Sequence, residues 1–408
     1  MKEDLLITGI SQLVTAEGAG PKRGRDMRTV KFVEGAAIAI SSGRITWTGK
    51  ERDWTGHAAT TVNAGGCAVV PGLVDPHTHS VWAGDRLNDF EARTSGSTYE
   101  SILAAGGGIR STIRATAMNS PENLVALAKP RVESLIHSGA TTIEIKSGYG
   151  FTRAAELAML EVIHSLSTIL PARIVPTLLI HIPPVNDTER ARYVTQICEE
   201  LIPEIAGRKL ATSVDVFVEK EAWSVVEAEQ MFRAAKQHGL AIKLHSDQFH
   251  CIGGVELGIR FGALSVDHLE ASGPKQIAEI AASSTIATIL PGVSLHLGMP
   301  AAPGRKLIDA GAAVAVGTDL NPGSSPLFST SAALALAVRL NGLTAQEALV
   351  AGTVNAASAL GLTDTGRVEA GCPADFLVLH SNDWRELVYA LGTNPVHEVW
   401  IGGRRVQQ

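Results

Sequence analysis

Two histidines separated by one residue end a short apolar run near residue 70. The run at residues 69–80 reads VVPGLVDPHTHS, and a Pro-Gly step interrupts it before His77 and His79. In an extended backbone, side chains two residues apart point to the same side, so both imidazoles can approach one ion. Imidazole suits zinc, iron, nickel or copper, whereas magnesium and calcium prefer oxygen. Such a pair is also typical of packed structural histidines. Whether further ligands appear at later strand ends therefore decides between a metal site and a structural pair.

Comparable residues end four further apolar runs. They are His181, His245 in KLHSDQ, His268 in SVDHLE and Asp319 in AVGTDLNPGS. Each one alone fits a structural histidine or a helix-capping aspartate. Together with the first pair, they place six groups suited to metal binding and proton transfer at the same relative position of five runs. This pattern predicts a metal-dependent catalytic centre.

The elements that must position these residues alternate between apolar β-rich runs and amphipathic helical stretches. This alternation is typical of βα units and a parallel sheet. Eight units favour a (β/α)8 TIM-type barrel, whose active site lies at the C-terminal strand ends; an open doubly wound sheet is the alternative. The glycines at 106–108 do not follow the first strand as GxGxxG, which argues against a dinucleotide site. The predicted strands are 68–79, 140–147, 173–181, 213–219, 241–247, 263–270, 285–291 and 313–319.

Both chain ends have the texture of short strands and turns. TGISQ and SSGRI read as hairpin segments, with Gly and Ser between alternating apolar residues. The α/β barrel is therefore predicted at residues 67–367. A small β-sandwich domain is predicted from both termini, at residues 1–66 and 368–408.

Composition narrows the class of protein. A chain of 408 residues that is 45% hydrophobic and 19% charged can bury a large core. Its formal charge of −6 argues against a nucleic-acid or membrane surface. Four scattered cysteines without a CxxC pair indicate neither a disulfide framework nor a thiolate zinc site. Without a signal-peptide pattern or a run of about 18 apolar residues, a cytoplasmic location is expected.

These motifs resemble the amidohydrolase superfamily of metal-dependent hydrolases, with His-x-His on strand 1, His on strands 5 and 6, and Asp on strand 8. Within it, the chain is similar to the imidazolonepropionases of histidine degradation. The similarity runs from about residue 69 to residue 370. Its specific segments are PGLVDPHTHSVWAGDR, FEARTSGSTYESILAAGGGIRST, TTIEIKSGYG, SVDVFVE, LSVDHLE and DLNPGSSP.

The resemblance implies one divalent or trivalent transition metal per chain, zinc or iron, held by His77, His79, His245 and Asp319. A metal lowers the pKa of its bound water toward neutrality, which yields a metal-bound hydroxide. Asp319 would accept the water proton and pass it to the leaving nitrogen, while His268 would polarise the carbonyl oxygen.

Two lysines bear on the number of metals. A second metal in this superfamily usually requires a carboxylated lysine on strand 4, and the resemblance does not support Lys220 in that role. Lys146 lies in strand 2, where KSGYG is a substrate-side element. A single metal is therefore expected.

Substrate recognition is also implied by the resemblance. Arg86 matches a clamp for the propionate carboxylate, which guanidinium binds in a planar, bidentate way; the alternative is a surface arginine paired with Asp85 or Asp89. Deaminases of the superfamily often carry Glu at the position of Gln248, whose amide cannot titrate and favours hydrolysis of a cyclic amide. The turn at DLNPGS could equally cap a helix. The full predicted substrate set is Arg86, Tyr99, Tyr149, His181, Gln248, Asn321, Gly323 and Ser324, with Gln248 also in the catalytic set.

The activity implied is hydrolysis of the cyclic amide C–N bond of 4-imidazolone-5-propanoate to N-formimidoyl-L-glutamate. Residues 178–187 and 291–299 depart from the family's usual pattern, so the identity of the substrate ring is not fixed by the sequence. A hydantoin- or thiohydantoin-type propionate and an aminohydrolase substrate are the enzymatic alternatives, and a barrel that only binds is the non-enzymatic one. The resemblance suggests a homodimer, and no nucleic-acid or membrane partner is expected.

Overall fold

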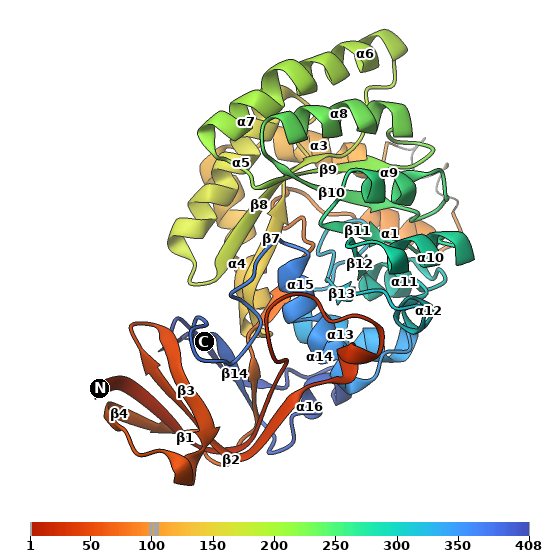
Figure 1. Cartoon of the computed structure of the whole chain (residues 1–408). Helices are drawn as coiled ribbons and strands as arrows, with labels where there is room; N and C mark the ends of the chain where they lie inside the picture. The colour runs from red at the N-terminus through yellow and green to blue at the C-terminus, as the bar shows by residue number, and fades with distance from the viewer. Residues whose placement is uncertain (1, 98–100, 102–105, 408) are drawn as a thin grey trace.

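Eight parallel strands form a barrel-like sheet that carries most of the chain (Figure 1). This computed structural model describes residues 2–97, 101 and 106–407. Neighbouring strands follow chain order from β6 to β13, as repeated βα units require. The predicted TIM-type barrel is therefore confirmed. Its strands are β6 (Leu73–Asp75), β7 (Ala140–Lys146), β8 (Arg173–Ile180), β9 (Ser213–Val218), β10 (Ala241–Ser246), β11 (Ser265–His268), β12 (Ile286–Ile289) and β13 (Val314–Val316).

The first and last barrel strands meet just beyond their C-terminal ends. Thr78 and Leu320 form a parallel bridge. The N–H of His79 donates to the Leu320 carbonyl, and the N–H of Asp319 donates to the His77 carbonyl, each at 2.9 Å. Closure of the sheet therefore places the first histidine pair directly beside Asp319.

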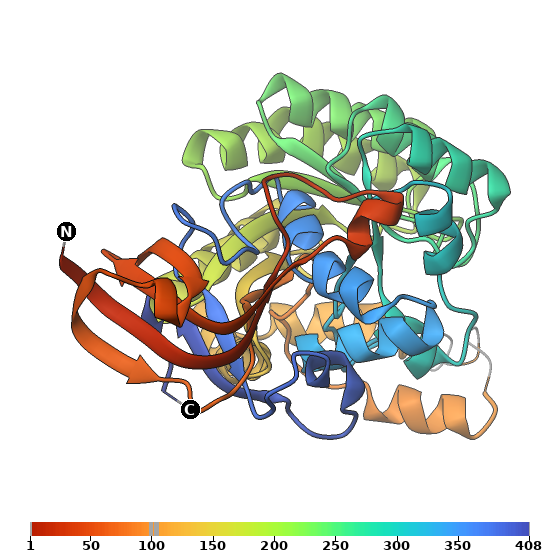
Figure 2. The ribbon, with the colours of Figure 1, turned by 60° about the horizontal axis from the view of Figure 1, so that its bottom comes forward.

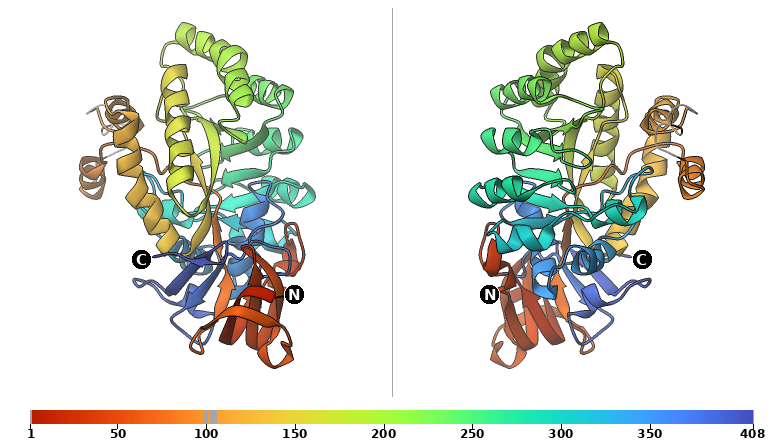
Figure 3. Two further views of the ribbon diagram at one scale, coloured as in Figure 1. Left: turned by 90° about the vertical axis from the view of Figure 1, so that its left-hand side faces the viewer. Right: turned by 90° about the vertical axis from the view of Figure 1, so that its right-hand side faces the viewer.

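Helices surround the barrel sheet, as the two side views in Figure 3 show. Their buried faces are apolar at helical spacing, as with Leu157, Leu160 and Ile163 of α5, and they join one continuous core with the strands. The described helices are α1 (Leu87–Thr94), α3 (Ile109–Ala117), α4 (Pro121–His137), α5 (Arg153–Ile169), α6 (Asp187–Gln196), α7 (Ile202–Arg208), α8 (Val225–Gln237), α9 (Gly254–Arg260), α10 (Pro274–Ala282), α11 (Pro291–Leu297), α12 (Gly304–Asp309), α13 (Thr330–Leu340), α14 (Ala345–Ala351), α15 (Val354–Ser358) and α16 (Glu386–Tyr389). None of these helices is long and apolar enough to cross a membrane.

The prediction of one strand at residues 68–79 was wrong. The run divides at Gly72 into β5 (Val69–Pro71), which belongs to the terminal sheet, and β6, which belongs to the barrel. A Cβ atom at Gly72 would clash with the side chain of Thr141, so only glycine fits where the chain passes between the two sheets. Hydrophobicity alone shows that both halves are buried, but not that they join different sheets.

The two chain ends build one separate mixed sheet, which confirms the expected β layer from both termini. Figure 2 shows N- and C-terminal segments together in it. SSGRI is confirmed as the β2–β3 hairpin, but TGISQ is not a hairpin, because β1 continues through it with an irregular register between Ile7 and Ile10. Its strands are β1 (Lys2–Thr15), β2 (Lys31–Ser41), β3 (Arg44–Lys50), β4 (His57–Asn63), β5, β14 (Phe376–Leu379), β15 (Val396–Ile401) and β16 (Arg404–Arg405).

Candidate active site

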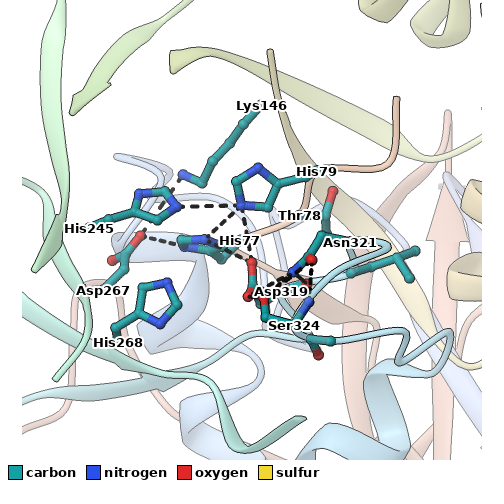
Figure 4. Close-up of polar contacts among 12 residues, drawn as sticks. His77, Thr78, His79, Lys146, His245, Asp267, His268, Asp319, Asn321 and Ser324 are labelled. Carbon is teal, nitrogen blue, oxygen red and sulfur yellow. Dashed lines mark hydrogen bonds and ion pairs between the residues drawn. The ribbon is translucent and has the colours of Figure 1, made fainter. Parts of the chain in front are cut away.

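Three imidazoles and one carboxylate converge at the C-terminal ends of the barrel strands (Figure 4). Nε2 of His79 lies 3.3 Å from Nε2 of His77 and 3.4 Å from Nε2 of His245. Oδ1 of Asp319 lies 3.3 Å from Nε2 of His77 and 3.1 Å from Nε2 of His79. All four side chains are buried. The structure therefore brings the predicted ligand set together from distant parts of the chain.

Four of the separations among these atoms match those of a tetrahedral transition-metal site. Zinc bonds of about 2.0–2.1 Å place tetrahedral ligands about 3.3 Å apart, and the separations here are 3.1, 3.3, 3.3 and 3.4 Å. Oδ1 of Asp319 is buried without a hydrogen-bond partner among the described residues. Ligand-type atoms of His77, His268 and Asp319 also lie within 4.8 Å of one another. The donor set of nitrogens and one carboxylate suits zinc or iron.

The electrostatics of the cluster favour neutral rings at His79 and His245, a charged ring at His77 and an ionised aspartate. Burial lowers the pKa of His79, and it holds the pKa of His245 well below its ordinary value. Burial alone would raise the pKa of Asp319, but the adjacent imidazoles of His77 and His79 hold it well below its usual range. Burial also opposes charge on His77, yet hydrogen bonds to Asp267 and Asp319 raise its pKa to about 9. Positive charge is therefore stabilised between His77 and Asp319, where a metal cation would bind.

Two buried carboxylates contact the far nitrogens of two of these imidazoles. Nδ1 of His77 lies 2.7 Å from Oδ2 of Asp267, and Nδ1 of His245 lies 2.8 Å from Oδ1 of Asp215. A carboxylate on one ring nitrogen fixes the ring's orientation and leaves the other nitrogen for a metal. Asp215 and Asp267 therefore hold His77 and His245 in a ligating orientation.

Two buried lysines neutralise these carboxylates from inside the barrel. Nζ of Lys146 lies 2.7 Å from Asp215 and 2.8 Å from Glu144. Nζ of Lys243 lies 3.5 Å from Oδ2 of Asp267 and 2.7 Å from the Ser265 hydroxyl. Lys146 was predicted to belong to a substrate-side element, but its ammonium is fully buried in this network and supports the site from within the barrel.

Strained backbone gathers at the strand ends that carry the site. Asp247, His268, Leu269 and Asp319 have φ values of 55°, 85°, 72° and 51°. Non-glycine residues in this region cost about 1–3 kcal/mol each, and such strain is concentrated at functional sites. The His268 ring lies 5.2 Å from the His245 ring, centroid to centroid, so His268 borders the cluster as predicted.

Arg86 lies against the turn at residues 321–324. Its side chain is 13% exposed, and its Nε pairs with Asp89, whose carboxylate also accepts the Gly108 N–H at 3.0 Å. A Cβ atom at Gly323 would lie 3.2 Å from Nη1 of Arg86. The pairing with Asp89 that the sequence offered as an alternative is thus present, but in a mostly buried arginine beside the site.

Asn321 ties this turn to Asp319. Its Nδ2 donates to Oδ2 of Asp319 at 3.0 Å and to the Asp319 carbonyl at 2.7 Å. Its Oδ1 accepts the N–H groups of Gly323 and Ser324, each at 2.8 Å. The Asn321 amide is therefore engaged in holding the aspartate and the turn.

Two further predicted substrate residues, Tyr149 and His181, have rings that lie near the ring of His79. The His79 ring centroid lies 6.1 Å from that of Tyr149 and 5.6 Å from that of His181. Burial raises the pKa of Tyr149 and lowers the pKa of His181 to about 3, so both are neutral at pH 7. Gln248 is buried. Tyr99 lies outside the described residues.

A lysine-bridged second metal has no support at the end of β9. Lys220 is exposed, whereas the convergent ligand-type side chains are buried. Glu219 is buried, and its carboxylate accepts the N–H groups of Lys220, Phe249 and His250. The carboxylate that precedes Lys220 therefore anchors loops.

Sequence reasoning missed the charged side chains that support the histidines. The available signal was a charge inside an otherwise apolar strand, because such residues are almost never fully buried unless they are paired. Lys243 stands two residues before His245, on the same face of β10. The missed residues are Glu144, Asp215, Lys243, Asp267 and Glu270.

Comparison with known proteins places this fold and site in a class. The family model described as "Amidohydrolase family" matches residues 68–406. The imidazolonepropionase of Deinococcus deserti is 62% identical over 404 residues, which cover 99% of this chain and 100% of that protein. That of Deinococcus radiodurans is 60% identical with the same coverage. The chain therefore belongs to the amidohydrolase family and, within it, to the imidazolonepropionases.

A solved structure supports the architecture. An adenosine deaminase from Xanthomonas campestris, determined with bound zinc, superposes with a TM-score of 0.74. The match covers 99% of this chain and 93% of that chain at 20% sequence identity. At this identity the likeness shows the shared fold and carries nothing about the substrate.

Proposed function

We propose that this chain hydrolyses the cyclic amide C–N bond of 4-imidazolone-5-propanoate to give N-formimidoyl-L-glutamate in histidine degradation. The observation that carries the proposal is that Nε2 of His79 lies 3.1–3.4 Å from ligand atoms of His77, His245 and Asp319. The substrate ring and the type of reaction are inferred from the chain's membership of the imidazolonepropionases.

The proposed ligands of one zinc or iron ion are His77, His79, His245 and Asp319. When bound, either ion supplies an activated water and polarises the ring carbonyl. Imidazoles bind a metal in their neutral form, which leaves the ion most of its charge. The buried position of the cluster excludes bulk water around it. Asp215 and Asp267 keep two of the rings oriented from behind.

The proposed proton carrier is Asp319, whose Oδ2 is fixed by the Asn321 amide while Oδ1 faces the imidazoles. A carboxylate held in this way accepts the water proton and returns it to the departing ring nitrogen. His268 is proposed to hydrogen-bond the carbonyl oxygen as negative charge develops there. Gln248 is proposed to hydrogen-bond the ring without changing its own protonation.

Arg86 is proposed to bind the propionate carboxylate. Asp89 orients it through Nε, while Nη1 faces the turn at Gly323, which leaves a guanidinium edge for a planar carboxylate. Tyr149 and His181 are proposed to flank the ring. Tyr99, Asn321, Gly323 and Ser324 complete the proposed substrate set, with Asn321 acting mainly by holding the turn.

Product analysis tests the function. Metal-loaded protein is incubated with 4-imidazolone-5-propanoate and, separately, with the hydantoin and thiohydantoin propionates. We expect N-formimidoyl-L-glutamate from the first and no ammonia. If only a hydantoin ring is opened, the proposed substrate is wrong and a hydantoin propionate takes its place. Release of ammonia would indicate a deaminase. Bound metal without turnover on any ring would favour a barrel that only binds.

The chain's division and assembly are further proposals. We propose the barrel domain at residues 67–367, with residues 1–66 and 368–408 as the second domain, and a homodimer in the cytoplasm. The separate sheet of the terminal strands and its own apolar cluster support this division. Light scattering and limited proteolysis of the full chain check the dimer and the boundaries.

A further inference from the structure

Glu270 is a buried carboxylate that the proposed chemistry leaves without a role. Its side chain is 1% exposed, and neither Oε1 nor Oε2 has a hydrogen-bond partner within the described part of the chain. Burying an ionisable group without hydrogen bonds is costly. An unsatisfied carboxylate of this kind therefore requires an explanation.

The polar group that lies closest to this carboxylate among the described residues belongs to His268, a histidine of the site. Oε2 of Glu270 lies 3.5 Å from Nδ1 of His268, and this Nδ1 is itself buried without a hydrogen-bond partner among described residues. His268, the last residue of β11, and Leu269, which follows it, hold positive φ values of 85° and 72°. The backbone is therefore strained where it turns the Glu270 carboxylate toward the imidazole.

The pair differs from the two histidine–carboxylate pairs of the proposed metal site. Asp215 lies 2.7 Å from a lysine ammonium and Asp267 lies 3.5 Å from another. Glu270 has His268 as its only recorded ion-pair partner among the described residues. The first two carboxylates serve the proposed ligands His245 and His77, whereas Glu270 serves the histidine beside the metal ligands.

We propose that Glu270 is a positioning residue that acts through His268, and that it keeps a hydrogen on Nε2 of this ring for the substrate's carbonyl oxygen. This proposal rests on the proposed function. The proposed arrangement places two hydrogens on the pair: one lies between Nδ1 and the Glu270 carboxyl group, and the other is on Nε2, which donates it to the developing oxyanion. It differs from the pairs at His77 and His245, where Nε2 carries no hydrogen and is left for the metal.

Two substitutions separate orientation from charge. Glu270→Leu is similar in size and offers no hydrogen bond, whereas Glu270→Gln retains an amide that can donate to Nδ1 and preserve the Nε2 hydrogen. We expect kcat on 4-imidazolone-5-propanoate to fall about 10- to 100-fold in Glu270→Leu and less in Glu270→Gln. KM and metal content are expected to stay close to those of the unaltered protein.

The matched control is Glu347→Gln. Glu347 is equally buried, but it pairs with Arg28 at 2.9 Å and with Arg305 at 2.8 Å. Among the described residues it forms no ion pair with a residue of the site. Its substitution is expected to lower thermal stability and leave kcat unchanged. A loss of kcat in Glu270→Leu that exceeds the loss in this control therefore cannot come from a weakened fold alone.

A readout independent of turnover completes the test. In zinc-loaded protein with 15N-labelled histidine, the His268 ring should show a hydrogen-bonded Nδ1 that changes in Glu270→Leu. Unchanged His268 signals together with unaltered kcat would overturn the inference. If the unaltered protein does not open the imidazolone but the His268 signals respond to Glu270→Leu, the proposed function fails and the pairing stands. Should Glu270→Leu not fold, the same signals and kcat in Glu270→Gln decide.

Discussion

The interiors of the barrel sheet and the terminal sheet are filled in different ways. The terminal sheet buries an apolar cluster that includes Ile7, Ile10, Ile38, Phe376 and Trp400. The barrel, in contrast, buries charged side chains beneath its histidines. These side chains, each 0% exposed, are Glu144, Lys146, Asp215, Lys243 and Asp267.

Stability explains the first interior but not the second. Burying one aliphatic or aromatic side chain contributes about 1.5–3 kcal/mol, whereas buried ion pairs are often no more stabilising than apolar residues of the same volume. The charged network contacts the imidazoles of His77 and His245 directly. We infer that the barrel interior keeps its charges in order to orient metal ligands, while the terminal sheet serves the fold.

The largest effect is expected from a substitution at the proposed metal site, above the charged side chains of the barrel. Asp319→Asn removes the proposed proton carrier and weakens the proposed metal site, so turnover should fall by about 10³-fold or more. Circular dichroism should show a folded protein. Asp53→Asn, at a position 63% exposed, is the control and should retain full activity. Unaltered rates in Asp319→Asn would remove Asp319 from the chemistry.

Lys146→Met tests the network itself. Removing one partner leaves Asp215 and Glu144 buried and uncompensated, which typically costs about 3–5 kcal/mol of stability. We also expect metal affinity to fall about 10- to 100-fold, because the support behind His245 is disturbed. Chemical denaturation and competition with a chelator measure the two effects. A stable variant with unchanged metal affinity would show that this lysine is dispensable.

Arg86→Ala should act on substrate binding and leave both interiors intact. A charged hydrogen-bond pair contributes about 1.5–3 kcal/mol, so KM should rise about 10- to 100-fold with a much smaller change in kcat. Arg52→Ala, at a position 77% exposed, is the matched control. An unchanged KM would exclude Arg86 from carboxylate recognition.

Ile38→Val tests the apolar interior at the smallest scale. The loss of one buried methylene should reduce the free energy of unfolding by about 0.5–1.5 kcal/mol. Because Ile38 belongs to the terminal sheet cluster, kcat, KM and metal content should not change. A kinetic effect larger than the stability effect would mean that the two interiors are coupled.

Strand order and the main histidine cluster were predictable from the sequence. Apolar runs that end in His245, His268 or Asp319 repeat with helical stretches between them, so the barrel rule alone places their ends at one edge. In the structure these strand ends lie together, with Nε2 of His79 within 3.4 Å of ligand atoms of His77, His245 and Asp319.

The supporting charges could not be paired from the sequence, because their partners depend on strand register and side-chain direction. Lys146 ends β7 and contacts Asp215 of β9, two strands away. The change of sheet at Gly72 is hidden for a related reason: both halves of the run are equally apolar and buried. The strained backbone that directs Glu270 toward His268 also leaves no signal in the hydrophobic pattern of the sequence.

Metal titration of stripped protein tests the central claim most directly. Zinc or iron is added back in known amounts, and turnover of 4-imidazolone-5-propanoate is measured against bound metal per chain. Turnover is predicted to rise linearly from zero and to level off at one metal per chain. Turnover without metal, or a plateau only at two metals per chain, would contradict a single metal held by His77, His79, His245 and Asp319.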